Sequence, residues 1–139
     1  MSVSPALPGP LAASALVAVG GATGAVLRYQ AGRAVTAAVG PAAAGVFPWA
    51  TLAVNVAGSL AMGLLAGWLA RHGSGGEAWR LLLGVGLLGG FTTFSAFSLE
   101  MILMIERGAV GAAAIYAFFS VLAGAAALFA GLLVMRVAG

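Results

Sequence analysis

Four apolar segments determine what this chain can fold into. Each reaches the roughly 20 residues that a helix needs to cross the hydrocarbon core of a membrane, and short turns rich in glycine, proline or charge separate them. Within a bilayer, only helices and closed barrels satisfy every backbone hydrogen bond. We therefore expect an all-α integral membrane protein with spans at about residues 11–29, 49–70, 81–105 and 109–135, the first continuing amphipathically toward Val39.

The sparse charge of the chain supports this class and excludes others. Only 6% of the 139 residues are charged, against about 25% in soluble domains. Six arginines and three glutamates are too scattered for a nucleic-acid surface, and the lack of cysteine excludes disulfides and thiolate metal sites. The sequence contains no nucleophile–base pair, phosphate-binding loop or metal-ligand cluster. We expect one membrane domain over residues 1–139 and no enzyme.

The third apolar segment departs from an ordinary membrane helix. Its stretch Gly84–Glu100, GVGLLGGFTTFSAFSLE, combines four glycines with four hydroxyl side chains and ends in a carboxylate. Irregular backbone at membrane depth is tolerated only where protein buries it or where it lines a wet cavity. Broken helices in transporters often hold ions with the backbone groups that the break releases. We expect a break near residues 89–93 and an ion path beside it.

Two phenylalanines after the expected break favour an anion in that path. Phe94 and Phe97 are three residues apart and share a helix face, among the hydroxyls of Thr93 and Ser95. The edge of an aromatic ring carries partial positive charge. Ring edges turned toward a path would hold an anion weakly enough for it to leave again, as conduction requires. The alternative is that both rings are ordinary core or lipid-facing side chains.

Polar side chains also line up on the second and fourth spans. Thr51, Asn55 and Ser59 are spaced four apart and fall on one helix face. A buried amide needs partners, so Asn55 either holds two helices together or offers its donors to a dehydrated anion. Tyr116 and Ser120 place two hydroxyls in line, unless the tyrosine anchors at the interface and the serine bonds back to its own helix.

Two charged residues are candidates for the same path. Arg28 is expected at the end of the first helix, where it either snorkels to the headgroups or raises the local anion concentration in a vestibule. Glu100 is the one carboxylate inside an apolar span, where ionisable groups are costly and usually functional. It could pair with an arginine or take part in proton coupling.

The arginines predict no preferred orientation in the membrane. If the two chain ends share a side with the loop between the second and third spans, three arginines lie on each side. An excess on one side normally sets orientation, although such a count often fails for a single protein. We expect a dual-topology chain that pairs with itself as an antiparallel homodimer.

Pairs of glycines four residues apart recur in three spans. This spacing lets helix backbones approach closely in lipid, so it predicts a compact bundle without indicating any chemistry. The pairs are Gly20 with Gly24, Gly63 with Gly67, and Gly86 with Gly90.

Three segments together resemble the CrcB/Fluc family of fluoride channels. They are GGATGAVLRY (20–29), WATLAVNVAGSLAMG (49–63) and GLLGGFTTFSAFSLE (86–100), of which GGFTTFSAFS beside a mid-membrane asparagine is the specific part. The resemblance covers nearly the whole chain from about residue 20. It implies a passive channel in the plasma membrane that exports fluoride and relieves its toxicity. It also implies an antiparallel homodimer with two pores.

The resemblance further implies roles for individual residues. A structural sodium ion would lie at the dimer centre, bound by the backbone carbonyls of Gly89 and Thr92 of each subunit. Ala96 and Gly124 depart from the family pattern because each removes a hydroxyl, which puts the conduction rate in question more than the function. The other matched positions would form the ion path: Asn55 with Thr51 nearby, Phe94 and Phe97, Thr93 and Ser95, Tyr116 and Ser120, Arg28 in a vestibule, and Glu100 closing the motif.

Two other functions fit parts of the same pattern. A small dual-topology multidrug transporter coupled to protons is also a four-helix antiparallel dimer, but it needs a membrane-embedded acid, and here Glu100 comes late in its span. A non-conducting scaffold protein would need only the packing glycines.

Overall fold

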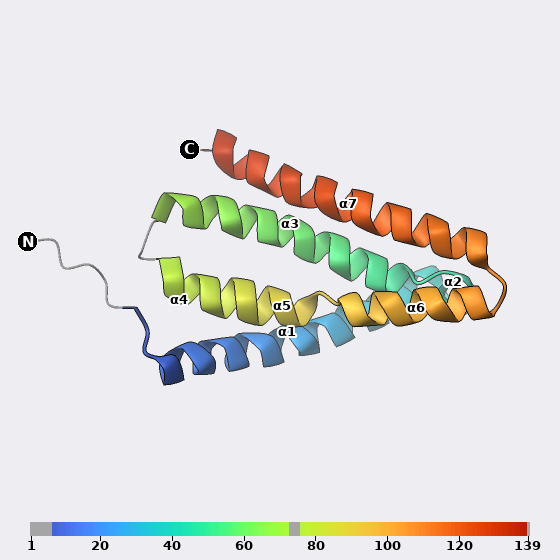
Figure 1. Cartoon of the computed structure of the whole chain (residues 1–139), viewed down its shortest axis with the longest axis horizontal. Coiled ribbons are helices and arrows are strands. Elements are labelled where there is room, and N and C mark those ends of the chain that lie inside the picture. The colour runs from blue at the N-terminus through green and yellow to red at the C-terminus, as the bar shows by residue number, and fades with distance from the viewer. Residues whose placement is uncertain (1–6, 73–75, 139) are drawn as a thin grey trace, which may run out of the picture.

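The computed structural model describes residues 7–72 and 76–138, and every regular element in these ranges is helical. Three helices, α1 (Pro10–Val39), α3 (Trp49–His72) and α7 (Val110–Val137), and the segmented stretch Glu77–Glu106 are long and apolar enough to cross a membrane. They form one elongated bundle in which α1 starts and α7 ends at the same end (Figure 1). The chain is therefore an all-helical, multi-pass membrane protein, as the sequence predicts.

The first helix continues past Tyr29 to Val39, as the sequence predicts. It begins at Pro10, whose fixed φ and missing N–H suit a first helical turn, and ends at Gly40, whose φ of 85° is left-handed. Arg28 therefore lies inside α1 and not at its end, because residues compatible with a helix follow it as far as Gly40. A short helix, α2 (Pro41–Val46), then leads across the end of the bundle toward α3.

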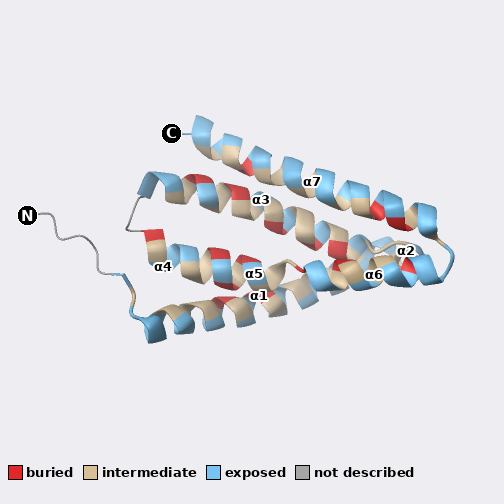
Figure 2. Cartoon of the chain, viewed as in Figure 1, coloured by how far each residue is buried: buried red, intermediate tan, exposed pale blue. Residues whose placement is uncertain are grey.

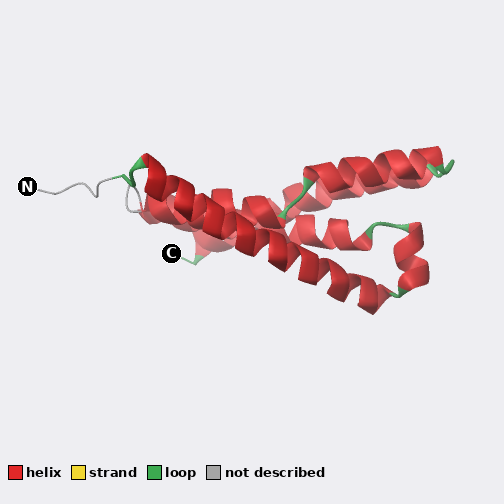
Figure 3. Cartoon of the chain, turned by 90° about the horizontal axis from the view of Figure 1, so that it is seen from below, coloured by secondary structure: helices red, strands yellow, loops and turns green. Residues whose placement is uncertain are grey.

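The third spanning stretch consists of several helical pieces. A single turn, α4 (Glu77–Trp79), precedes a π-helical stretch, η2 (Arg80–Leu88), and then α5 (Gly89–Phe91) and α6 (Phe94–Glu106). Between α5 and α6, Thr92 has ψ of 157° and Thr93 has φ of −148° and ψ of 120°, so both are extended. This short connection lies near the middle of the long axis of the bundle (Figure 3). Residues 73–75 of the expected polar loop before α4 lie outside the described residues.

Glycines bring α1 directly against η2 and α5. A methyl group on Gly24 would fall onto the Leu87 carbonyl oxygen, and one on Gly90 would lie 3.0 Å from the Gly21 Cα. Gly86 is equally close, since its added methyl would lie 2.9 Å from the Gly20 Cα. The two backbones are therefore in contact, and the glycine spacing of both spans is used for helix packing as predicted.

A second glycine interface joins α3 to α7. A methyl group on Gly63 would fall onto the Leu128 carbonyl oxygen, and one on Gly131 would lie 2.7 Å from the Leu64 amide nitrogen. Gly67 faces the side chain of Met135 in the same interface. The bundle is thus built from two tightly packed helix pairs, with α6 packed against α7 near the other end of the molecule (Figure 1).

Burial is confined to the faces where these helices meet. Figure 2 shows buried positions along the inner sides of the helices and exposed ones along the outer sides. Large apolar side chains such as Phe118, Phe119 and Val121 are exposed on α7. In a membrane these outer faces meet lipid or another subunit, so exposed apolar area is expected here.

Candidate functional site

The interruption of the third span is held by the side chain of Asn55. Its Oδ1 accepts a hydrogen bond from the Thr93 backbone N–H at 2.8 Å, and its Nδ2 donates to the Thr93 carbonyl oxygen at 3.0 Å. The Thr93 hydroxyl in turn accepts from the Ala96 N–H at 3.2 Å and caps α6. Asn55 therefore does bridge α3 and the third span. This pair of hydrogen bonds uses only one of the two hydrogens on its Nδ2.

A groove of about 310 Å³ opens beside this pair of hydrogen bonds. Asn55 and Thr93 line it together with Phe94, Phe97 and Ser120. Among the described residues, Ser120 Oγ is a buried side-chain oxygen with no hydrogen-bond partner. The Phe94 side chain is 78% exposed in the single subunit, so one wall of the groove is open. The groove brings together polar groups from α3 and α7 with the two rings of α6.

A row of aromatic rings leads from the groove toward the end of α6. The ring centres of Phe94 and Phe97 are 5.7 Å apart, and those of Phe97 and Tyr116 are 5.0 Å apart. Phe97 is buried and Tyr116 is fully buried, whereas Phe94 is exposed. Phe47, in the connection after α2, makes an edge contact with Tyr116 at 5.3 Å. The sequence motif did not indicate Phe47, because it lies outside any polar pattern.

The carboxylate of Glu100 joins three helices. Its Oε1 accepts from the Thr51 hydroxyl at 2.6 Å, and its Oε2 accepts from the Tyr116 hydroxyl at 2.8 Å. Of the two alternatives left open for Glu100, pairing with an arginine is not found among the described residues, whose one ion pair joins Arg80 to Glu77. Hydroxyl donors stabilise this half-buried carboxylate without neutralising its charge.

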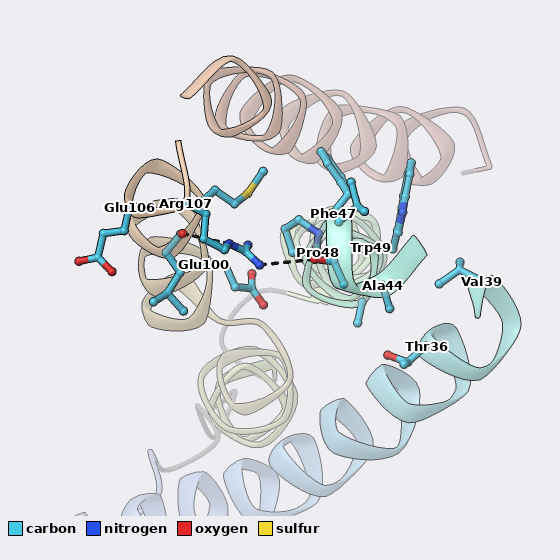
Figure 4. A pocket seen from close by; sticks show the side chains of 14 residues that line it. Thr36, Val39, Ala44, Phe47, Pro48, Trp49, Glu100, Glu106 and Arg107 are labelled. Atoms are coloured by element: carbon cyan, nitrogen blue, oxygen red, sulfur yellow. Dashed lines mark hydrogen bonds between the residues drawn. The ribbon is translucent and has the colours of Figure 1, made fainter. Parts of the chain in front are cut away.

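A larger cavity of about 490 Å³ adjoins Glu100 on the side away from the groove. It lies between the end of α1, α2, the start of α3 and the second half of α6 (Figure 4). Glu106 and Arg107 at the end of α6 also line it. Groove, aromatic row, Glu100 and cavity thus follow one another along α6 toward one end of the bundle.

The remaining predicted residues lie apart from this row. Arg28 lines a more open hollow with Tyr29 and Arg33, and this hollow adjoins the cavity at Thr36 and Ala50. Ser95 is exposed, and its hydroxyl lies 3.4 Å from that of Thr93. A methyl on Gly124 would lie 3.4 Å from Ser59 Oγ, so a hydroxyl side chain at this position would meet the polar stripe of α3.

The backbone carbonyls of Gly89 and Thr92 are the donors that the resemblance assigns to a structural sodium ion. In a continuous helix the Thr93 N–H would donate to the Gly89 carbonyl, but here it donates to Asn55. The Gly89 carbonyl therefore lacks that donor, and the Thr92 carbonyl belongs to an extended residue. Carbonyls of unwound helices coordinate sodium in transporters. The donor set fits the ion that the resemblance implies. The described residues contain no cluster of acidic, histidine or cysteine ligands.

Comparison with known proteins gives one consistent answer. The protein named fluoride-specific ion channel FluC from Novosphingobium aromaticivorans is 64% identical over 126 residues, which cover 91% of this chain and 98% of that protein. Proteins with the same name from Erythrobacter litoralis (56% over 128 residues, 91% and 94% covered) and Caulobacter vibrioides (54% over 122 residues, 87% and 93% covered) are also similar. These names give the alternative of a multidrug transporter no support. The family model described as "CrcB-like protein, Camphor Resistance (CrcB)" matches residues 15–132, and the chain belongs to this CrcB family.

Proposed function

We propose that this chain is a passive, fluoride-selective ion channel of the plasma membrane. The relatives described above are named fluoride-specific ion channels. For this chain itself, the proposal depends on the groove beside Asn55. There the buried hydroxyl of Ser120, which has no partner in the described part of the chain, lines the same space as the rings of Phe94 and Phe97. A buried polar group without a partner is unfavourable, and a dehydrated anion would supply the missing acceptor.

The chemistry of the lining suits fluoride better than a larger anion. Fluoride is small and strongly hydrated, so a path must replace its water with several donors. The Ser120 hydroxyl, the second amide hydrogen of Asn55 and the ring edges are neutral donors. Neutral donors hold an anion without the grip of a full positive charge, which lets it leave. Such a path carries fluoride down its gradient and exports it when the cytoplasm holds the excess.

We further propose that the channel is an antiparallel homodimer of dual topology. One side of the groove is open in the single subunit, and Phe94 stands exposed at that opening. A second, inverted copy would close the groove and shield Phe94. The sequence predicts three arginines on each side of the membrane, and a chain without an arginine bias is compatible with an inverted partner.

A structural sodium ion would stabilise such a dimer. The carbonyls of Gly89 and Thr92 would hold it, since the Gly89 carbonyl has lost its helical donor to Asn55. Two inverted copies would present the same carbonyls to a point on the axis between them. The ion would offset the partial negative charge of these oxygens and link the subunits.

Fluoride efflux from liposomes tests the proposed function. Purified protein is reconstituted into vesicles loaded with potassium fluoride, and valinomycin is added to release the counter-ion. We expect rapid fluoride release without a proton gradient, and no comparable release from vesicles loaded with potassium chloride. Fluoride release no faster than from protein-free vesicles would refute the channel and leave a non-conducting scaffold. Release that requires a proton gradient would indicate coupled transport instead.

A further inference from the structure

Arg107 lies at the end of α6, where its side chain spans the gap to α2. Its Nε donates to the Leu103 carbonyl oxygen at 3.1 Å, and its Nη1 lies 3.4 Å from the Gly45 carbonyl oxygen. Figure 4 shows the guanidinium group directed toward the connection that carries Phe47 and Pro48. Both acceptors are neutral carbonyls, so these hydrogen bonds direct the side chain toward α2, and Arg107 forms no ion pair among the described residues.

The cavity beside Arg107 has an unfavourable charge for an anion. Three of its lining residues are charged, and two of them, Glu100 and Glu106, are acidic. Figure 4 shows the carboxylate of Glu106 pointing away from the cavity, so Glu100 is the negative group that faces an ion approaching from this end. Like charges a few ångströms apart in a partly apolar cavity repel strongly.

Arg107 is the positive charge among the residues that line this cavity. Arg28, to which the sequence assigned the role of a vestibule charge, lines the neighbouring hollow, which adjoins this cavity at Thr36 and Ala50 but does not contain Glu100. The two positions differ in their relation to Glu100: Arg107 shares a cavity with it, and Arg28 does not. A positive charge at the mouth of a narrow cleft raises the local concentration of anions.

We propose that Arg107 is the residue that admits anions to the ion path at this end, by offsetting the negative charge of Glu100 in the shared cavity. This inference rests on the proposed channel function. Arg107 thus raises the local concentration of the anion before it reaches the groove beside Asn55. The removal of water from the anion takes place in that groove and does not involve Arg107. Its two hydrogen bonds to backbone carbonyls keep it over the cavity when no anion is present.

The experiment compares fluoride efflux at low and high ionic strength. Arg107→Gln removes the charge, and Arg107→Lys retains the charge but loses the forked hydrogen-bond geometry. Arg136→Gln is the matched control, because it removes an exposed arginine at the far end of α7. Vesicles of neutral lipid are used, with ionic strength set by a salt of a large, impermeant organic anion at about 0.01 M or about 1 M, where the Debye length is about 30 Å or about 3 Å.

We expect the initial rate of R107Q at low ionic strength to be at least about threefold below that of the unaltered protein. R107K and R136Q should match the unaltered protein, and the R107Q deficit should vanish at high ionic strength, because salt screens the charge. Equal rates for R107Q and the unaltered protein at low ionic strength would overturn the inference. So would a deficit that persists at high salt and that lysine does not restore, since that result assigns Arg107 a mechanical role in holding α2. Absence of fluoride efflux from the unaltered protein would instead refute the proposed function, and this inference with it.

Discussion

Asn55 and Thr93 exchange two hydrogen bonds across the bundle, at 2.8 and 3.0 Å. The Asn55 side chain, on α3, thereby bonds the Thr93 N–H and carbonyl of the third span, which a continuous helix would bond to its own backbone. A backbone N–H and carbonyl at membrane depth must find partners. Asn55 provides both partners for Thr93, one of the two extended residues of the third span. The residue that stabilises the interruption is thus also a wall of the groove.

Replacing Asn55 should therefore impair both stability and flux. Asn55→Ala leaves the Thr93 N–H and carbonyl without partners and should lower the free energy of unfolding by about 2 kcal/mol or more. Asn55→Asp keeps an acceptor for the Thr93 N–H, but it sets a carboxylate oxygen against the Thr93 carbonyl oxygen. It also places a negative charge in an anion path. Thermal unfolding in detergent and fluoride efflux measure the two effects. Thr23→Ala is the control, because its exposed hydroxyl bonds only to its own helix. Unchanged flux in both Asn55 variants would mean that the residue is structural alone.

Replacing Phe94 or Phe97 should slow fluoride efflux in both cases, but only the replacement of Phe97 should lower the stability of the single subunit. Phe97 is buried against Tyr116 with ring centres 5.0 Å apart, so Phe97→Ile should cost about 1 kcal/mol or more of stability. Phe94→Ile changes an exposed side chain and should leave the single subunit intact. Both variants should slow fluoride efflux sharply while the dimer still forms, because the ring edges are lost. Normal efflux in both variants, alongside the control Phe129→Ile, would refute the role of the edges.

Glu100→Gln separates a passive path from a coupled one. The carboxylate accepts hydroxyl hydrogen bonds on both oxygens, whereas a glutamine has one acceptor oxygen and turns its amide hydrogens toward a donor. We expect a loss of stability of about 1.5–3 kcal/mol, as for hydrogen bonds to charged groups, with fluoride efflux largely retained. Efflux in the presence and absence of a proton gradient is the measurement. If efflux by the unaltered protein requires the proton gradient and Glu100→Gln abolishes it, the result favours the proton-coupled transporter.

The contact between α1 and the third span should tolerate no methyl group at Gly24. The added carbon would fall onto the Leu87 carbonyl oxygen and lie 2.8 Å from the Phe91 amide nitrogen. Overpacking of this kind typically costs about 1–3 kcal/mol. Gly21→Ala is the matched control, because its methyl would meet its nearest atom, the Gly86 carbonyl oxygen, at 4.0 Å. Equal melting temperatures of the two variants would show that the helices can move apart without cost.

Removal of sodium should weaken the assembled protein if the carbonyls of Gly89 and Thr92 bind the ion. Protein purified in a large organic cation and then titrated with sodium should gain thermal stability by mass action, about 2.7 kcal/mol at a hundredfold excess over the dissociation constant. Potassium should give a smaller gain, because it is larger than the ion that the site is proposed to fit. Identical melting curves in sodium, in potassium and in the organic cation would contradict the site.

Much of the architecture could be predicted because it depends on local patterns. Apolar length alone places four spans, since segments of about 20 apolar residues satisfy their backbone hydrogen bonds in lipid as helices. The glycine pairs mark the faces that meet, because a methyl group on Gly24 or Gly63 would collide with the backbone of the neighbouring helix. The continuation of the first helix to Val39 was predicted and is confirmed, but Arg28 does not end the helix, because only Gly40 and Pro41 stop it.

The pairing of side chains was decided by the tertiary structure. The sequence identified Asn55 and Glu100 as buried polar groups that need partners, but the partners lie far away in the chain: Thr93 for the first, Thr51 and Tyr116 for the second. It likewise counted Arg107 as a membrane-side charge, without indicating that it shares a cavity with Glu100. Composition and periodicity determine which residues leave water and which face of a helix they occupy. Which donor meets which acceptor depends on the crossing and register of helices, and these are set only when all four spans pack together.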